Sequence, residues 1–464
     1  MTDNERVLVI GLDSVPQGFV FERFLPQMPT FRRLLERGRS GTLWSTDPPI
    51  TVPAWAVMFS GMDPGSLGLY GFHHRRKGTY WESYLPTPKL IRHPQVWDLL
   101  SQQGRRSCVI GMPPGYPPPK VNGVYISDFL TPKGAEDFVW PRSMVPEILN
   151  VAGGYDFDVS FRAEDRDRIG RQLFEMTRRR FSVARHLWKK EAWDFFAIHE
   201  IGPDRLHHTF WKYFDPDHNR YEPHPVFSAL ADEYYHLLDT EIASLLELVP
   251  PDVTVLLVSD HGSQAMTGCF CLNEWLAEKG YLTYRNTAAA PGTQLEKADI
   301  DWSRTKAWGA GGYYGRVFFN VRGREPEGIV APDDIPELTR SLTADLEKVR
   351  RPDGELLGCR VLLPRETYRD VQGDPSDLML YFGDLKWRSA GTVGHHKLFL
   401  AENDTGPDDA VHSFDGFFLL VTPQDTQGKR LGTQKINDIG PTLLTRMGFA
   451  PPAHMIGKAI PELL

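Results

Sequence analysis

The feature that most constrains the fold of this chain is an apolar, β-branched segment that ends abruptly in polar residues. Residues 253–258 read Val-Thr-Val-Leu-Leu-Val and lead through Ser259 into Asp260, His261 and Gly262. An apolar run without polar alternation is typical of a strand buried on both faces, and ligands of parallel α/β sheets bind beyond the carboxyl ends of such strands. The pattern therefore predicts a functional sheet edge, although an Asp turn with a solvated His fits an isolated Asp-His-Gly equally well.

Two more apolar segments end in side chains that can bind a metal. Residues 7–13 end in Asp13, which fits a metal ligand or a helix cap. Residues 193–200 predict a third buried strand, which is followed by Asp204 and His208. A spacing of four residues places these two side chains on one face of a helical turn, where they can share one transition metal. Such pairs also arise by coincidence, and the adjacent His207 points about 100° away.

Thr51 and His412 are two further candidates. Thr51 precedes Pro53 and an apolar helical run, so its hydroxyl is expected at the positive end of a helix, which suits a phosphate-bearing or alkoxide oxygen. A helix N-cap explains Thr51 more simply when it is taken alone. His412 comes shortly before Gly416 and an apolar strand, from where it could complete a metal shell.

The length of 464 residues allows one large α/β domain with insertions or several smaller domains. We expect residues 1–267 to form the main α/β catalytic domain, with a loop or cap excursion at about 70–162 that is rich in Pro, Gly, aromatic and basic residues. Residues 268–390 predict a smaller α+β insertion, and residues 391–464 a return to the main domain.

Charge and cysteine usage exclude several classes of function. The formal net charge of −8 gives no whole-chain attraction for nucleic acid or an anionic membrane, so an anionic substrate must be held by local groups. Four cysteines form neither a zinc-finger pattern nor a disulfide framework. The polar first residues lack the apolar stretch of a signal peptide, and no run approaches a membrane span. We therefore expect a soluble, cytoplasmic protein.

Local basic segments have two interpretations. Arg75, Arg76 and Lys77 lie in the excursion, where they would approach an anionic substrate or form a solvated basic turn. Residues 165–190 predict a long basic helix, for which a solvated face is the simpler explanation. Aromatic residues of the excursion suit contacts to a base or sugar, but they suit a core as well.

Together the candidates supply three carboxylates, three imidazoles and one hydroxyl. They are Asp13, Thr51, Asp204, His208, Asp260, His261 and His412. Mixed nitrogen and oxygen donors fit two divalent metals, and no Cys-based site is indicated. Two metals about 4 Å apart assist in-line phosphoryl transfer by activating the attacking oxygen and stabilising the leaving oxygen. Coordination of this kind would also activate a threonine hydroxyl, which is otherwise a poor nucleophile.

The order of these motifs resembles the alkaline phosphatase superfamily, and within it the type I phosphodiesterase/nucleotide pyrophosphatase branch. The similarity runs from Val7 to the segment Ile439-Gly440-Pro441-Thr442. It implies an α/β fold with an alkaline-phosphatase-like, mostly parallel central sheet flanked by helices and a smaller α+β insertion. It also implies two metals, usually zinc and in some members manganese or iron.

The resemblance assigns a role to each candidate residue. Thr51 would be the nucleophile that becomes transiently phosphorylated. One metal would be bound by Asp204, His208 and His412. The other would be bound by Asp13, Asp260 and His261 and would also hold the Thr51 oxygen.

The chain also departs from the family pattern. Leu67-Gly68 stands where many relatives carry His-Gly, and no clear phosphate-binding Asn follows Thr51. Residues 403–409 are candidates to support the site or set specificity, although an ordinary polar turn explains them equally well.

The resulting expectation is a two-metal hydrolase of phosphodiesters or nucleotide-like pyrophosphates that acts on a small phosphorylated substrate. Neither a nucleic-acid polymer nor a membrane is an expected partner, and the oligomeric state is left open. A phosphomonoesterase, a phosphonate hydrolase and a phosphomutase remain alternatives on the same fold. A sulfatase is disfavoured because Thr51 cannot be oxidised to formylglycine. In another class, the chain would be a metal-free binding protein that kept the fold.

Overall fold

A computed structural model describes residues 5–286 and 289–464 of the chain. Its main part is built on a central sheet whose middle five strands, β9-β1-β8-β5-β6, are all parallel. Their bounds are β1 (Val7–Leu12), β5 (Ser107–Ile110), β6 (Gly123–Ile126), β8 (Phe195–Glu200) and β9 (Thr254–Val258). Antiparallel neighbours extend this sheet at both ends, so the mostly parallel sheet expected from the sequence is confirmed.

The strands at the ends of the sheet come from distant parts of the chain. Next to β9 lies β21 (Asp415–Val421), followed by β2 (Arg39–Trp44), and β7 (Val139–Trp140) lies beside β6. Short strands β22 (Lys429–Arg430) and β23 (Gln434–Lys435) both pair with β2. The C-terminal part of the chain therefore returns to the sheet formed by the N-terminal part.

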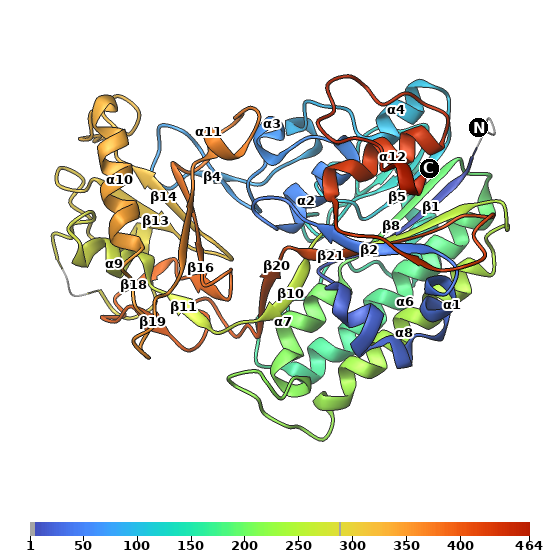
Figure 1. Cartoon of the computed structure of the whole chain (residues 1–464), viewed down its shortest axis with the longest axis horizontal. Helices are drawn as coiled ribbons and strands as arrows, with labels where there is room; N and C mark the ends of the chain where they lie inside the picture. The colour runs from blue at the N-terminus through green and yellow to red at the C-terminus, as the bar shows by residue number, and fades with distance from the viewer. Residues whose placement is uncertain (1–4, 287–288) are drawn as a thin grey trace.

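Helices cover both faces of the central sheet (Figure 1). One layer consists of α1 (Pro29–Leu35), α6 (Arg166–Lys190), α7 (Gly202–Phe214) and α8 (Phe227–Leu246). The other contains α2 (Thr51–Ser60), α4 (Val96–Gln102) and α12 (Ile439–Arg446). Side chains of β1 alternate between the layers, with Leu8, Ile10 and Leu12 facing the first core and Val7 and Val9 the second. This double burial explains why β1 is apolar at every position.

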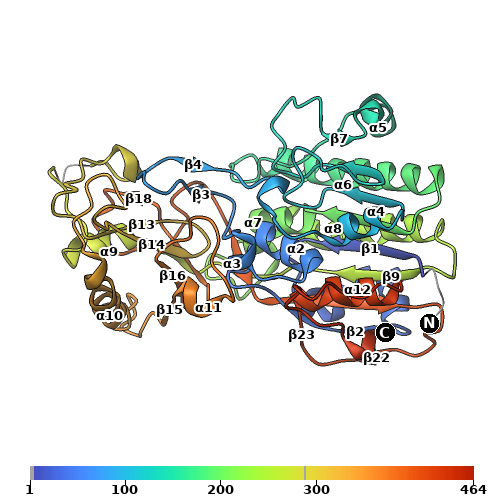
Figure 2. The ribbon, with the colours of Figure 1, turned by 90° about the horizontal axis from the view of Figure 1, so that it is seen from above.

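A smaller, mainly antiparallel sheet stands beside the central one, as Figures 1 and 2 show. Its strand order is β13-β14-β16-β17-β11-β19, with β15 paired to β16. The bounds are β11 (Gly268–Phe270), β13 (Ala307–Ala310), β14 (Gly315–Phe319), β15 (Cys359–Leu362), β16 (Leu378–Phe382), β17 (Trp387–Ser389) and β19 (Phe399–Leu400). Helices α9 (Leu272–Glu278) and α10 (Ile335–Leu346) complete a separate apolar core.

Two short strands lie where the chain passes between the sheets. They are β10 (Gly262–Ala265) and β20 (Ala410–Ser413), which pair antiparallel with Ser263 opposite His412. This ribbon brings the segment after β9 next to the segment before β21 (Figure 1). The exact boundaries of the expected domains stay predictions.

Residues 70–162 contain more regular structure than the loop or cap excursion expected from the sequence. This segment supplies β5 and β6 of the central sheet, together with α4 and α5 (Val145–Ala152). Each of the two strands has only four residues, so its apolar pattern is too short to stand out among the surrounding Pro and Gly. No described helix has both the length and the apolar character needed to span a membrane.

Close packing of α2 on β1 sets the position of Thr51, the first residue of α2. Gly11 on β1 leaves room for the indole of Trp55, because a Cβ atom added at Gly11 would lie 2.4 Å from the ring. Trp55 is fully buried and donates a hydrogen bond from Nε1 to Oδ2 of Asp13 at 2.9 Å. The absent side chain at Gly11 therefore allows the helix to approach the end of β1.

We expect Gly11→Ala to lower the free energy of unfolding by about 1–3 kcal/mol, because the new methyl group collides with a buried ring. Urea denaturation of the metal-free protein measures the change. Gly18→Ala is the matched control, since a Cβ there meets no atom within 4 Å and the backbone φ of −59° suits alanine. Equal stability of the two variants would contradict this account of the packing.

Candidate metal centre

All seven residues expected at the site lie together at the carboxyl edge of the central sheet. Asp13 follows β1, Asp260 and His261 follow β9, and Asp204 and His208 lie on α7, which begins just after β8. Thr51 begins α2, and His412 lies on β20. None of the seven is more than 2% exposed. Because β1, β8 and β9 are adjacent and parallel, their ends bring these side chains to one place.

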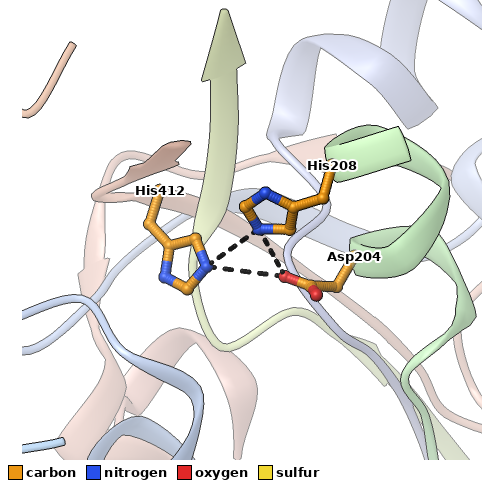
Figure 3. A group of neighbouring side chains, drawn as sticks. All are labelled: Asp204, His208 and His412. Carbon is orange, nitrogen blue, oxygen red and sulfur yellow. Dashed lines mark hydrogen bonds and ion pairs between the residues drawn. The ribbon is translucent and has the colours of Figure 1, made fainter. Parts of the chain in front are cut away.

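The first group is formed by Asp204, His208 and His412 (Figure 3). One ligand atom from each residue lies within 4.8 Å of the others. Nε2 of His208 and Nε2 of His412 are 3.3 Å apart, and they lie 3.3 and 3.5 Å, respectively, from Oδ1 of Asp204. The three side chains point toward one another from α7 and β20, so they enclose a small volume lined by two nitrogens and one oxygen.

The second group is formed by Asp13, Asp260 and His261, whose ligand atoms also lie within 4.8 Å of one another. Nε2 of His261 is 3.2 Å from Oδ2 of Asp260 and 3.8 Å from Oδ1 of Asp13. The Thr51 hydroxyl oxygen lies 3.3 Å from Oδ1 of Asp13 and 3.2 Å from Nε2 of His261. Rings of His261 and His412 stack with centroids 4.0 Å apart, so the two groups adjoin each other.

Hydrogen bonds leave one nitrogen of each histidine available to a metal. Nδ1 of His208 lies 2.6 Å from Oδ1 of Asp408, Nδ1 of His412 lies 2.8 Å from the Pro49 carbonyl, and Nδ1 of His261 lies 3.0 Å from the Gly262 carbonyl. Each of these oxygens accepts, so a hydrogen sits on Nδ1, and Nε2 faces its group and presents a lone pair there whenever it is unprotonated.

Two carboxylate oxygens provide the test of whether a cation fits. Oδ1 of Asp204 and Oδ2 of Asp260 are buried, and neither has a hydrogen-bond partner among the described residues. Buried carboxylate oxygens without partners are costly unless a cation balances them. One such oxygen lies in each group beside imidazole nitrogens, a donor set that suits zinc, manganese or iron. The two buried groups are thus consistent with a binuclear metal site.

The surroundings shift the pKa values of Asp260 and Asp204 in opposite directions. Burial and the nearby charge of Asp13 raise the pKa of Asp260 well above its usual value. Burial also acts to raise the pKa of Asp204, but the charges of His208 and Arg205 outweigh it and hold this pKa well below its usual value. Asp13 and Asp260 therefore form a pair of like-charged groups that a divalent cation would relieve.

The surroundings also shift the pKa values of the three imidazoles. Burial, assisted by the charge of His412, lowers the pKa of His261 to about 3, and burial lowers the pKa of His412 as well. Both rings are therefore neutral near neutral pH, the form that binds metal. For His208, burial opposes protonation, but the carboxylate of Asp408 is the largest of several charges that outweigh it and raise its pKa well above the usual value.

Several supporting residues were not predicted from the sequence. His199 and Trp55 both contact Oδ2 of Asp13, at 2.7 and 2.9 Å. His199 lies near the end of β8, and a polar residue in that apolar strand was the available signal. Asp408, which contacts His208, belongs to the polar 403–409 segment that the sequence analysis singled out. Only the contact itself shows which residue of that segment reaches the centre.

Other polar residues discussed from the sequence lie elsewhere. His207 turns away from both groups, with Nε2 2.8 Å from the Tyr235 hydroxyl and Nδ1 2.9 Å from Oγ of Ser263. In the basic turn, Arg75 forms an ion pair with Glu325 at 3.2 Å, and the exposed side chains of Arg76 and Glu82 pair at 3.3 Å.

We expect Asp408→Asn to weaken metal binding by about 10- to 100-fold, because Asp408 orients His208 and increases its basicity. The pKa of His208 is raised in the metal-free protein, so metal binding near neutral pH displaces a proton from its ring. Removing the Asp408 charge lowers that pKa and reduces the proton release. Titration calorimetry in two buffers of different ionisation enthalpy measures both quantities.

Asp409→Asn is the control for this substitution. Burial raises the pKa of Asp409 to about 7, and neither of its carboxylate oxygens has a hydrogen-bond partner among the described residues. Its neutral isostere should therefore leave both affinity and proton release close to those of the unaltered protein. Unchanged metal binding in Asp408→Asn would contradict the assigned role of Asp408.

Comparisons with known proteins agree with this architecture. Curated protein sequences provide no match to the chain. Among solved structures, murine ectonucleotide pyrophosphatase / phosphodiesterase 5 is similar with a TM-score of 0.57, 13% sequence identity and coverage of 97% of each chain, which shows a shared fold. The sequence model of the type I phosphodiesterase / nucleotide pyrophosphatase family matches residues 7–409. The chain therefore belongs to the type I phosphodiesterase / nucleotide pyrophosphatase family.

Proposed function

We propose that this chain is a two-metal-dependent hydrolase of phosphate esters that acts through a phosphothreonine at position 51. The observation that carries the proposal is the placement of the Thr51 hydroxyl, which touches Asp13 and His261 of one group while His261 stacks on His412 of the other. A buried hydroxyl at the meeting point of two such groups is suited to attack a phosphorus atom.

The surroundings of Thr51 favour an attacking oxygen over a simple helix cap. Thr51 is itself the first residue of α2, and Ile50, which precedes it, provides no side-chain cap. Its hydroxyl donates to Oδ1 of Asp13 at 3.3 Å, which orients the oxygen, and the positive end of α2 favours negative charge nearby.

Asp204, His208 and His412 would hold one metal, and Asp13, Asp260 and His261 the other. When bound, the two cations would supply positive charge that lowers the pKa of the Thr51 hydroxyl and stabilises the leaving oxygen. We propose zinc, with manganese or iron as alternatives, because all three accept mixed imidazole and carboxylate ligands.

Membership of the family supports a phosphodiester or a nucleotide-like pyrophosphate as the substrate. A phosphomonoesterase, a phosphonate hydrolase or a phosphomutase would use the same seven residues, because fold and metal ligands do not determine the leaving group. The rates of hydrolysis of p-nitrophenyl phosphate and bis-p-nitrophenyl phosphate distinguish a phosphomonoesterase from the proposed diesterase. We expect the diester to react faster, and a dominant monoester rate would reverse the assignment.

A metal-free binding protein is the alternative from another class. The partnerless oxygen of Asp260 argues against it, because Asp260 is buried beside Asp13 and a binding protein gains nothing from two adjacent buried acids. Metal analysis of the purified protein distinguishes the two, since only the hydrolase should carry stoichiometric transition metal.

We expect Thr51→Ala to reduce kcat on a diester by at least about 1000-fold, because it removes the attacking atom. Thr51→Ser keeps a hydroxyl and should retain measurable turnover. Mass spectrometry of quenched reactions of the unaltered protein should find on Thr51 the phosphoryl group of the diester, still esterified to the alcohol that has not departed. Undiminished turnover of Thr51→Ala, with metal content preserved, would contradict the proposal.

A further inference from the structure

Two adjoining cavities lie beside the candidate metal centre, although none of its seven residues lines either of them. The nearer one, of about 140 Å³, is lined by Ile50, the neighbour of Thr51, and by Tyr313. The larger one, of about 540 Å³, is lined by residues from the hairpin of β3 (His74–Arg75) and β4 (Ser83–Tyr84) and from β13 and β14 (Figure 2). Arg162, Arg316 and Arg388 line both cavities, so guanidinium groups stand where the two adjoin.

Tyr313 connects the nearer cavity to the metal centre. Its ring stacks on that of His412 with centroids 3.9 Å apart, and its hydroxyl lies 3.2 Å from Nε2 of His208. The guanidinium of Arg388 lies 4.3 Å from the centroid of the same ring. Tyr313 therefore contacts both the candidate metal centre and Arg388 of the cavity wall.

Arg316 has unused capacity to bind an anion. Its guanidinium donates to the backbone carbonyls of His73 and Gly311, at 3.0 and 3.2 Å. It forms no ion pair with any carboxylate that the structure describes. An arginine held in place by neutral carbonyls keeps its full positive charge available to a ligand.

Arg388 adds a second free donor. It is 4% exposed and pairs through Nη1 with Oδ2 of Asp408 at 3.0 Å, but its Nε is buried without a hydrogen-bond partner in the described part of the chain. The same Oδ2 atom also receives Arg162 at 3.0 Å, and Oδ1 is engaged by His208. One carboxylate therefore serves two guanidinium groups and an imidazole, which leaves an excess of positive charge at the cavity wall.

Three acidic residues also line the larger cavity, and none of them forms an ion pair with Arg316 or Arg388 among the described residues. Glu82 pairs with Arg76, and Asp404 accepts hydrogen bonds from the backbone N–H groups of Gly391 and Thr392. Glu296 is exposed and is not paired with Arg316. The position where the two cavities adjoin is therefore suited to a negatively charged group.

We propose that this position binds a second oxyanion of the substrate, a phosphate or carboxylate carried beyond the scissile phosphate, through Arg316 and Arg388. The proposal rests on the proposed function, since it assumes that the first phosphate lies at Thr51. It narrows the substrate class to phosphate esters or pyrophosphates that bear a further anionic group.

Binding of non-hydrolysable probes to the zinc-loaded full chain tests the proposal by calorimetry. Methylphosphonate occupies only the metal centre, whereas alkane bisphosphonates and ω-phosphonocarboxylates of increasing chain length can also reach the arginines. At the best chain length we expect binding at least about tenfold tighter than that of methylphosphonate. The two probe series distinguish a phosphate from a carboxylate as the second anion.

Arg316→Met should abolish the tighter binding of the longer probes and leave the affinity for methylphosphonate unchanged. That unchanged affinity shows that the variant is folded, and Arg316→Lys, which retains the charge, should keep part of the preference. Arg322→Met is the matched control, because Arg322 is exposed in the same part of the chain and lines neither cavity. It should bind every probe as the unaltered protein does.

The outcomes separate this inference from the proposed function. The second anion site is wrong, and the proposed function stands, in either of two cases. In the first, methylphosphonate binds but none of the longer probes binds more tightly. In the second, Arg316→Met still binds the longer probes more tightly than methylphosphonate. If methylphosphonate does not bind the metal-loaded protein, the proposed function fails and this inference fails with it.

Discussion

The main physical constraint on this structure is that two carboxylates, Asp13 and Asp260, are buried together at one edge of the central sheet. Neither is more than marginally accessible to water, and the charge of Asp13 adds to burial in raising the pKa of Asp260. In a protein that uses this edge only for packing, such a pair would lower stability without compensation. The arrangement is explained if the folded chain is selected to hold positive charge there.

Contacts from both parts of the molecule hold these groups in place. Trp55 on α2 and His199 on β8 fix Asp13. Asp408, which lies in the segment between β19 and β20, contacts His208. Asp408 in turn binds Arg162 and Arg388, and Arg388 packs on Tyr313. The smaller sheet therefore contributes to the environment of the metal centre as well as to the cavity beside it. These few side chains therefore link the candidate metal centre to the cavity beside it.

The sequence allowed the central part of the site to be predicted, but not its surroundings. Strands β1, β8 and β9 are mostly apolar because both faces are buried, and the polar residues at or just beyond their ends stand out against that background. Strands β5 and β6 are too short to give such a pattern. The contacts of Asp408 with His208 and of Arg162 with Tyr313 join residues that are 200 and 151 positions apart. No local periodicity encodes pairs of this kind, so they became visible only once the chain was folded.

Anomalous diffraction from crystals of the metal-loaded protein would locate any cations bound at this edge of the central sheet. Two peaks are expected at the absorption edge of the bound metal. One should lie among Asp204, His208 and His412, and the other among Asp13, Asp260 and His261 beside the Thr51 oxygen. Peaks elsewhere in the molecule with none at these groups, or a centre that holds a single ion distant from Thr51, would contradict the proposed two-metal site.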